Sequence, residues 1–356
     1  MPTNIDWGTE DLHIRREGRA GRITFRRPAA LNALSHPMAL AIEKALDQWR
    51  DHHEVELVLI DAEGERAFCA GGDVAAMHGQ AKAGQLDGPR QFWRDEYRMN
   101  AKIDGYDKPI VAFMQGFVMG GGVGVGGHAS HRIVGETVQV AMPECGIGLI
   151  PDVGGSLILG RAPGWIGEYL GLTGTRMGPG DAIHAGFADY FIPESGWEAL
   201  KRHLIDTADT HEFLRRAEPP PEGDRLAGLA DEIEHHFDRE GVTAILASLE
   251  RTDTDFARET AKVLRRNSPL SMAATLELIA RARTADTIEH ALENEFRFTY
   301  RCLTEGDFVE GVRAQIIDKD RKPRWKHARA EDVTPAEVAA ILAPLGDKSL
   351  HLERLA

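Results

Sequence analysis

The sequence predicts an α/β fold in which a unit of two short strands and a helix repeats, followed by a region made of helices alone. Up to about residue 205, short apolar runs rich in β-branched residues alternate with segments whose apolar residues recur every three or four positions. A repeat of two strands and a helix favours the stacked turns of a spiral over a doubly wound sheet. From residue 226 onward the spacing is that of helices.

Composition limits the kinds of function that the chain can have. Its 356 residues exceed the size at which one core usually stops growing, so we expect one large domain with an appended region. The net charge of -14 and the lack of a basic cluster argue against nucleic-acid binding. No apolar run is as long as a membrane span, and Cys69, Cys145 and Cys302 have neither disulfide nor zinc spacing. We therefore expect a soluble, cytoplasmic protein with no nucleic-acid or membrane partner.

The first half of the chain carries most of the predicted strands. Apolar and polar residues alternate at 12–16 and 22–25, which predicts a hairpin. Apolar runs rich in β-branched residues at 55–60 and 110–114 predict strands buried on both faces. A helix with Ser35 as its N-cap is expected to follow the hairpin, because apolar residues recur every three or four positions after it. The remaining predictions of this half are a loop at 79–90, a helix at 91–103, and strands at 132–134 and 138–141.

The second half is predicted to be mostly helical. Short helices in GGSLILG, WIGEYLGL and PGDAIHAG precede a last strand in FADYFIP and a helix at 197–205. A run of prolines within residues 215–224 marks a linker. Later helices are expected at about 226–238, 242–250, 254–266, 270–283 and 286–303, one of them beginning at Pro269, and a basic surface tail from about residue 318. We thus divide the chain into a core at 1–205, a linker at 206–225 and a helical region with its tail at 226–356.

Two glycine turns, CAGGD at 69–73 and MGGGVG at 119–124, each follow a predicted buried strand and are each expected to open a helix. The first residues of a helix have backbone N–H groups without partners, so two such turns facing each other can hold one developing negative oxygen. This pattern predicts an oxyanion hole. The alternative is that both are ordinary tight turns, which is the usual role of an isolated glycine cluster.

Two other patterns in this part of the sequence are set aside. The spacing GxGxxG, which is typical of dinucleotide sites, occurs at Gly122, Gly124 and Gly127. There is, however, no room for a crossover helix before the next strand. His128 and His131 suggest a metal pair, yet no third ligand lies near them in the sequence. We therefore predict neither a metal nor a dinucleotide cofactor.

Four motifs within about residues 23–192 resemble, in the same order, motifs of the enoyl-coenzyme A hydratase/isomerase (crotonase) superfamily. They are AFCAGGDV, GFVMGGGVG, AMPECGIGLIPDVGG and YLGLTGTRMGPGDAIHAGFADYF. Two later segments further resemble the 3-hydroxyisobutyryl-coenzyme A hydrolase branch of this superfamily, and with them the resemblance reaches the C-terminus. They are NSPLSMAATL and EFRFTYRCLTEGDFVEGVRAQIIDKDRKPRW. The resemblance implies a crotonase-type spiral. It also implies hydrolysis of a short 3-hydroxyacyl-coenzyme A thioester in valine catabolism, with coenzyme A as part of the substrate and no separate cofactor.

The resemblance also assigns roles to five residues of this sequence. Gly72 and Gly121 match the two backbone amides that hold the thioester oxygen. Glu144 matches the acid that faces the thioester, and Asp152 matches an aspartate expected to contact the substrate's 3-hydroxyl. An alternative for Asp152 is the N-cap of a helix starting at the next residue. Glu96 matches a further polar contact to the substrate, whereas a helical glutamate is ordinarily only solvated.

One position departs from the pattern of the hydratases. They use a second glutamate three residues after the middle glycine of the turn, where this chain has Gly124. Adding water to a double bond needs two groups that move protons, whereas thioester hydrolysis needs a polarised carbonyl and one carboxylate that acts as base or nucleophile. Hydrolysis is therefore expected. The alternatives are a hydratase or isomerase with Glu144 as its single acid/base, and a non-catalytic coenzyme A-binding protein.

Two further expectations concern binding partners. Superfamily members often form trimers or pairs of trimers, so the resemblance implies a homo-oligomer. The phosphates of coenzyme A require basic groups, for which Arg26, Arg27 and the basic tail are candidates.

Overall fold

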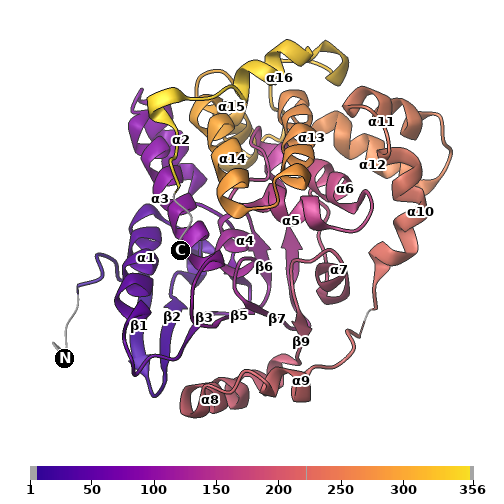
Figure 1. Cartoon of the computed structure of the whole chain (residues 1–356). Helices are drawn as coiled ribbons and strands as arrows, with labels where there is room; N and C mark the ends of the chain where they lie inside the picture. Colours follow the sequence, from indigo (N-terminus) through magenta and orange to yellow (C-terminus); the bar gives the residue numbers. More distant parts are fainter. Residues whose placement is uncertain (1–5, 222, 353–356) are drawn as a thin grey trace.

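The computed structural model describes residues 6–221 and 223–352, which fold into two β-sheets surrounded by helices (Figure 1). The larger sheet has the order β1-β2-β3-β5-β7-β9 and the smaller sheet the order β4-β6-β8. The strands are β1 (Leu12–Glu17), β2 (Ala20–Phe25), β3 (Leu57–Ala62), β4 (Ala67–Cys69), β5 (Ile110–Met114), β6 (Phe117–Met119), β7 (His131–Val134), β8 (Gln139–Ala141) and β9 (Tyr190–Phe191). The helices are α1 (His36–Arg50), α2 (Val74–Lys82), α3 (Asp87–Asp104), α4 (Gly121–Gly126), α5 (Gly155–Arg161), α6 (Ile166–Thr173), α7 (Pro179–His184), α8 (Trp197–Thr207), α9 (Glu212–Arg216), α10 (Arg225–Phe237), α11 (Val242–Glu250), α12 (Asp255–Arg266), α13 (Pro269–Thr284), α14 (Ile288–Cys302), α15 (Phe308–Val312) and α16 (Pro335–Ile341).

The two sheets are built by a repeated unit. Strands β3, β5 and β7 lie in the larger sheet, and each is followed along the chain by a strand of the smaller sheet, β4, β6 and β8. The β1–β2 hairpin is antiparallel, and the later strand pairs are parallel. Helices α2 and α4 follow β4 and β6, so successive units stack as turns of a spiral. The predicted α/β fold class is therefore confirmed.

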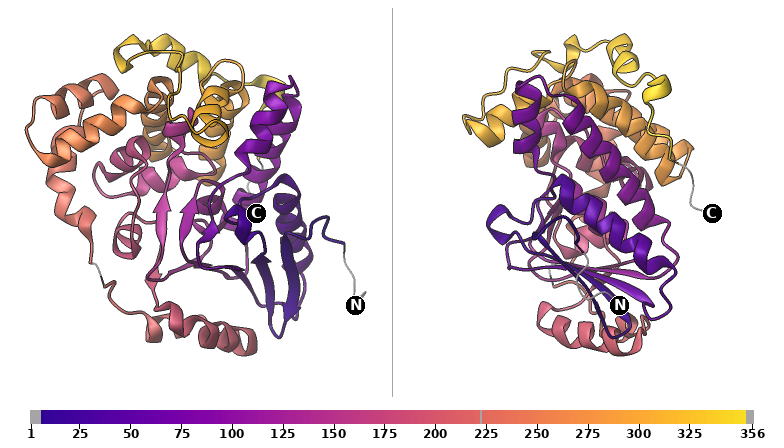
Figure 2. Two further views of the ribbon diagram at one scale, coloured as in Figure 1. Left: turned by 180° about the vertical axis from the view of Figure 1, so that it is seen from behind. Right: turned by 90° about the vertical axis from the view of Figure 1, so that its left-hand side faces the viewer.

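The larger sheet is buried on both faces. Leu57 and Leu59 of β3 pack in a cluster with α8, whereas Val58 and Ile60 pack in the main core with α1. All four side chains are fully buried, as the apolar run predicts, because alternate residues of a strand point to opposite faces. In the right-hand view of Figure 2, α1 and α8 lie on opposite sides of the sheet.

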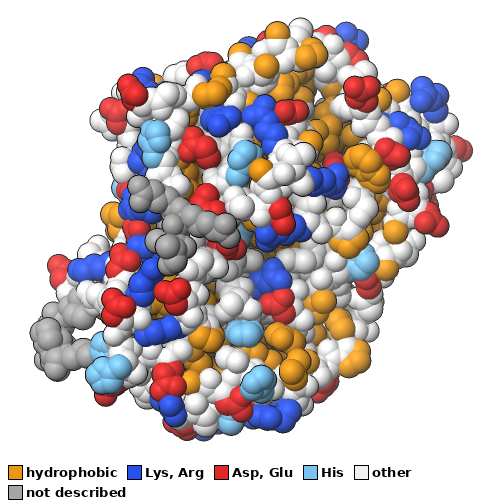
Figure 3. All heavy atoms as spheres, in the orientation of Figure 1, with side chains coloured by type: hydrophobic (Ala, Val, Ile, Leu, Met, Phe, Trp, Pro, Cys, Tyr) orange, Lys and Arg blue, Asp and Glu red, His pale blue; other side chains and the backbone are white. Residues whose placement is uncertain are grey.

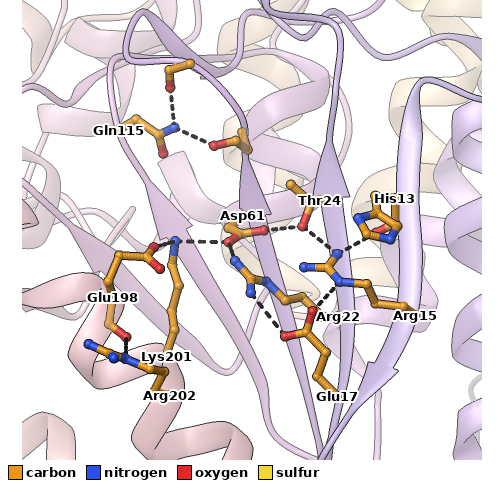
Figure 4. A network of polar contacts seen from close by, with 12 residues as sticks. His13, Arg15, Glu17, Arg22, Thr24, Asp61, Gln115, Glu198, Lys201 and Arg202 are labelled. Atoms are coloured by element: carbon orange, nitrogen blue, oxygen red, sulfur yellow. Dashed lines mark hydrogen bonds and ion pairs between the residues drawn. The ribbon is translucent and has the colours of Figure 1, made fainter.

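A polar network fastens α8 to the sheet (Figure 4). The buried carboxylate of Asp61 on β3 accepts hydrogen bonds from Arg22 Nη2 at 2.6 Å and from Thr24 Oγ1 at 2.6 Å, and Lys201 Nζ of α8 lies 2.9 Å away. Burial favours the neutral acid, but the charges of Lys201 and Arg22 outweigh it and hold the pKa of Asp61 below its usual value. The pairing removes the cost of an isolated buried charge.

Two predictions about the first half need correction. Residues 79–90 are not a loop, because α2 continues to Lys82 and α3 already begins at Asp87. Asp73 caps α2 by accepting a hydrogen bond from Ala76 N at 3.3 Å, which the sequence-based prediction overlooked. Ser35 does precede α1 in extended backbone, but its side chain makes no capping hydrogen bond.

The predicted helices of the C-terminal region are confirmed as α10 to α14. Ser268 caps α13 by accepting a hydrogen bond from Ser271 N at 3.2 Å, and Pro269 is the first helical residue. Helix α13 packs against α5 and α6, and α14 packs against α3 and α5 (Figure 1). The main core thus runs from the N-terminal strands into this region without interruption.

Two segments are more structured than expected. Within residues 206–225, predicted as a linker, α9 buries Phe213 against the cluster beneath the larger sheet. Beyond residue 318, the basic segment is exposed as predicted, but α16 follows it, and Ile341 at the end of this helix and the next residue, Leu342, are buried in the core. The division into a core, a linker and a helical region stays a prediction.

On the face seen in Figure 3, acidic and basic side chains are interspersed rather than sorted by sign. Among the described residues, the large hydrophobic side chains that stay exposed are Leu40, Leu214, Ile316 and Ile317. Within the same residues, the model contains no helix with the length and apolar character needed to cross a membrane.

Candidate active site

A cavity of about 230 Å³ lies where β4 and β6 end. These parallel strands each lead into one of the glycine turns, so the two turns meet at one edge of the smaller sheet. The cavity is also lined by α2, α3, the segment 143–153 and the π-helical turn Arg313–Ile317. All five predicted site residues line it: Gly72, Glu96, Gly121, Glu144 and Asp152.

The glycine turns bring two free amides together. Gly71 has a φ of +114° and Gly120 a φ of +46°, conformations that favour glycine and turn the chain sharply at each strand end. In the described part of the chain, neither the N–H of Gly72 nor that of Gly121 donates a hydrogen bond to a protein acceptor. A Cβ on Gly121 would lie 3.3 Å from the Gly72 nitrogen, so the turns are in contact. This geometry suits a shared acceptor such as a thioester oxygen.

Glu144 begins a short 3₁₀ helix, Glu144–Ile147, directly after β8. Its side chain is buried, and Oε2 has no hydrogen-bond partner among the described residues. Oε1 would lie 2.9 Å from a Cβ on Gly120, so the carboxyl group rests directly against the second glycine turn. Burial, and then the nearby charge of Asp152, raise the pKa of Glu144 well above its usual value. Such a perturbed, unpartnered acid in a cavity is typical of a functional group.

Two further acids face the same cavity. Glu96, on α3, is buried, and its Oε1 lacks a partner in the described structure and lies 2.8 Å from the Cβ position of Gly121. Burial, and then Asp152, raise the pKa of Glu96 well above its usual value. Asp152 accepts a hydrogen bond from Tyr97 Oη at 2.7 Å, and burial raises its pKa to about 6. Glu96 is therefore not an ordinary solvated helix residue.

The alternative role of Asp152 as a helix N-cap is wrong. Helix α5 begins at Gly155, with Gly154 at the N-cap position. The Asp152 side chain is directed to Tyr97 instead.

Asn100 and Val153 crowd the position of the missing glutamate. A Cβ on Gly124 would lie 2.7 Å from Asn100 Nδ2 and 2.8 Å from Val153 Cβ. Asn100 is fully buried, and both polar atoms of its amide lack partners among the described residues. A side chain at position 124 therefore has no space without rearrangement of its neighbours.

Three residues of this region, Tyr97, Asn100 and Ile316, were not among the predicted site residues. Tyr97 bonds Asp152, Asn100 fills the space beside Gly124, and Ile316 lines the cavity from the π-helical turn. A usable signal was present in α3, where Glu96 and Asn100 are one turn apart on a face that also carries Phe92. Polar residues on the apolar stripe of a helix indicate a buried polar site. The sequence held no comparable signal for Ile316.

The residues of the two patterns set aside have structural roles. The glycines of the GxGxxG belong to α4 and to its C-cap. His128 Nε2 contacts the carbonyl oxygen of Val153 at 2.8 Å, and the ring of His131 packs on Phe213 with centroids 5.0 Å apart. The two histidines thus serve different parts of the fold.

Comparison with known proteins agrees with this fold. The sequence model of the enoyl-CoA hydratase/isomerase family matches residues 20–342, which is most of the chain. This chain belongs to that family.

Relatives within the family carry different names. The 3-hydroxyisobutyryl-CoA hydrolase, mitochondrial, of Rattus norvegicus is 37% identical over 96% of this chain and 91% of its own length. The crystal structure of an enoyl-CoA hydratase from Rhodobacter sphaeroides 2.4.1 is 56% identical, with a TM-score of 0.92, covering 96% of this chain and 100% of that one. That of a carnitinyl-CoA dehydratase from Mycobacterium thermoresistibile is 40% identical, with a TM-score of 0.91, covering 96% and 98%. These names describe three different reactions.

Proposed function

We propose that this enzyme hydrolyses 3-hydroxyisobutyryl-CoA to 3-hydroxyisobutyrate and coenzyme A. The observation that carries the proposal is the cavity in which Glu144 lies against the glycine turns while Gly124 leaves no acid at the hydratase position. Relatives named for this hydrolysis support it, including the rat protein and the human protein, which is 35% identical over 96% of this chain. Hydrolysis of a thioester needs the groups that the cavity contains: a donor pair for the carbonyl oxygen and one carboxylate.

The first step is activation of the carbonyl group. The thioester oxygen accepts hydrogen bonds from the N–H groups of Gly72 and Gly121, which are free in the described structure. These donors stabilise the negative charge that develops on this oxygen as the carbonyl carbon becomes tetrahedral. Removing one such donor costs enzymes on the order of 3 kcal/mol of transition-state stabilisation.

The second step is attack on the carbonyl carbon, for which Glu144 is the group in place. As a general base it takes a proton from the attacking water, the C–S bond then breaks, and the coenzyme A thiolate leaves and takes up that proton. As a nucleophile it attacks the carbonyl carbon itself and displaces the coenzyme A thiolate, which forms an anhydride; water then opens the anhydride, and a proton released from this water ends on the thiolate. Both routes end with the carboxylic acid and the free thiol of coenzyme A, and both require ionised Glu144. Its raised pKa makes it a better proton acceptor than an ordinary glutamate.

The substrate's 3-hydroxyl is assigned to Asp152 and Glu96. Tyr97 occupies Oδ2 of Asp152, which leaves Oδ1 to accept a hydrogen bond from the hydroxyl. Glu96 Oε1, which has no hydrogen-bond partner among the described residues and lies beside Gly121, can also accept a hydrogen bond from this hydroxyl. A site built to bind a hydroxyl discriminates strongly against an acyl group that lacks it, because its buried polar groups would then stay unpaired.

Water addition to an enoyl-CoA thioester is the second candidate. It is favoured by the name of the 56% identical crystal structure and by Glu96, which gives the cavity a second glutamate on a different element from the usual one. One of Glu96 and Glu144 could then take a proton from the water that attacks the β-carbon, while the other delivers a proton to the α-carbon. A non-catalytic coenzyme A-binding protein, by contrast, would have no use for three buried acids.

Thiol release distinguishes the two reactions. The purified protein is mixed with 3-hydroxyisobutyryl-CoA, 3-hydroxypropionyl-CoA or crotonyl-CoA, and free thiol is followed with a thiol-reactive dye while the enoyl absorbance is recorded. Hydrolysis predicts fast thiol release from both 3-hydroxyacyl thioesters. Loss of enoyl absorbance from crotonyl-CoA without thiol release would instead establish the hydratase.

The basic segment after the π-helical turn is our proposal for the coenzyme A phosphates. Ile316 of that turn lines the cavity, and the following residues expose four basic side chains that form no ion pair with other described residues: Lys319, Arg321, Lys322 and Arg324. The other candidates are already engaged, since Arg26 pairs with Glu63 at 3.0 Å and Arg27 contacts Asp73 at 3.3 Å.

Assembly and location stay predictions. The expected trimer or pair of trimers calls for a measurement of mass in solution. The rat relative is named as mitochondrial, whereas the location predicted for this chain is cytoplasmic.

A further inference from the structure

The loop that carries Asp152 has an unfavourable backbone. Val153 has a φ of +55°, in the left-handed region that β-branched residues rarely occupy, and Gly154 follows with a φ of +79°. Such conformations persist where the surrounding structure holds them, and they gather at functional sites. Gly155 N also donates to the carbonyl oxygen of Asp152 at 2.7 Å, which ties the loop into one compact turn.

The group that holds this turn comes from the C-terminal region. Glu295 of α14 is fully buried, and its Oε2 accepts a hydrogen bond from Gly154 N at 2.8 Å. Its Oε1 accepts from Ser156 N at 3.0 Å and from the Ser156 hydroxyl. On the other side, His128 Nε2 contacts the carbonyl oxygen of Val153. The residues directly after Asp152 are therefore clamped between two side chains, and the carboxylate of Glu295 makes most of the contacts.

We propose that Glu295 is a positioning residue, whose carboxylate fixes the strained turn so that Asp152 meets the 3-hydroxyl of the substrate. It does not line the cavity and acts through the backbone of residues 154–156. The partner of Asp152 in this statement rests on the proposed function. The contact explains, in addition, how a helix far along the chain from the glycine turns contributes to the choice of acyl group.

The test compares 3-hydroxyisobutyryl-CoA with isobutyryl-CoA, which lacks the hydroxyl. The measured quantity is the ratio of kcat/KM for the two thioesters in the wild type, Glu295→Gln, Asp152→Asn and a control, Glu289→Gln, on the same helix. In Glu295→Gln, the new amide N–H group faces a backbone donor, so the turn shifts. Because a misplacement of about 1 Å can cost about 100-fold, we expect the ratio to fall by about 10- to 100-fold toward that of Asp152→Asn. Glu289→Gln should keep the wild-type ratio.

A merely structural role gives a different result. An unchanged ratio in Glu295→Gln, with only a lower unfolding temperature, would overturn the proposal while the collapse in Asp152→Asn still upheld the proposed function. An unchanged ratio in Asp152→Asn would overturn the assignment of the 3-hydroxyl itself, and with it the role of Glu295. If Glu295→Gln does not fold, Ser156→Ala removes one donor from the same carboxylate: a several-fold fall in the ratio supports the proposal, and no change refutes it.

Discussion

Three acids are buried around one small cavity, and none of them has a basic partner in the described structure. Glu96, Glu144 and Asp152 are each less than a tenth exposed, and burial raises the pKa of all three. Unpaired buried carboxylates cost folding free energy, so this arrangement is unfavourable for stability alone. Its persistence indicates that the acids serve the substrate.

Glu144→Gln is expected to remove turnover while keeping the fold. The amide can neither take a proton nor attack the thioester, so kcat should fall by about 100- to 10,000-fold. Because the raised pKa of Glu144 means that its ionised form is disfavoured in the folded protein, the variant should be at least as stable as the wild type at neutral pH. Thiol release and thermal unfolding measure the two quantities. Retention of most activity would remove Glu144 from the mechanism.

The acid limb of the pH–rate profile should reflect the same burial. Activity requires ionised Glu144, whose pKa is raised, so kcat/KM should increase with pH over a range well above the pKa of an ordinary glutamate, 4.5. Thiol release in constant-ionic-strength buffers, with an end-point thiol assay, gives this profile. A profile already flat from pH 5 would contradict an ionised, buried Glu144 as the attacking group.

Asp152→Asn should change how stability depends on pH. The pKa of Asp152 rises from 3.8 to about 6 on folding, so the folded state binds the proton more tightly than the unfolded state. The contribution of Asp152 to the free energy of unfolding is fully present below its pKa in the unfolded chain. It is lost as the pH rises through its pKa in the folded protein. One pKa unit corresponds to about 1.36 kcal/mol, so the wild type loses on the order of 3 kcal/mol of unfolding free energy between these two pKa values. The variant does not show this loss. Urea unfolding at pH 4 and pH 7 measures the difference, and parallel pH dependences would refute it.

Helix α4 contains Gly124, a glycine whose neighbours leave no space for a side chain. Gly124→Ala places a Cβ against Asn100 and Val153, and overpacking of this kind costs about 1–3 kcal/mol. Gly79→Ala on α2 is the matched control, because nothing lies within 4 Å of its Cβ position and alanine favours a helix by about 0.5–1 kcal/mol. Urea unfolding should show opposite signs for the two variants. Equal effects would mean that the space around Gly124 is not filled.

Gly124→Glu extends the same argument to the reaction. The variant restores the glutamate of the hydratases in sequence, but its side chain meets Asn100 and Val153 rather than open cavity. We expect lower stability and no gain in water addition to crotonyl-CoA, measured by enoyl absorbance. A gain would show that only this glutamate was missing.

The sequence predicted most elements because their signals are local. The strand at 110–114 and the helices α10 to α14 follow from short-range spacing, and the resemblance named five residues that the structure brings to the lining of one cavity. Contacts between elements that lie far apart in the sequence could not be predicted. Tyr97, Asn100 and Glu295 are polar residues of helices, which look like surface residues until the tertiary packing shows what they face. The helical ends of the predicted loop at 79–90 were missed because Gly79, Gly84 and Gly88 interrupt the helical pattern there.

For the whole molecule, the Asp61 network should determine behaviour in acid. Asp61→Asn leaves Arg22 and Lys201 without their buried carboxylate, which typically costs about 3–5 kcal/mol. The pKa of Asp61 is lowered on folding, so its stabilisation is present above the unfolded pKa of 3.8 and is lost as pH falls through the folded pKa. The deficit of Asp61→Asn should therefore be full at pH 7 and shrink below pH 4, opposite in sign to Asp152→Asn. Urea unfolding tests this, and a deficit independent of pH would contradict it.

The cavity wall also sets a condition on biosynthesis. Its lining begins at Ala70 and ends at Ile316, so its first and last parts are made far apart in time. At about 5–20 residues per second, synthesis of the intervening chain takes on the order of tens of seconds. From the synthesis of Asp152 onward, the nascent polypeptide contains α3 and the three acids without α14 or the π-helical turn to cover them. Catalytic competence is thus acquired late, when nearly the whole chain has left the ribosome.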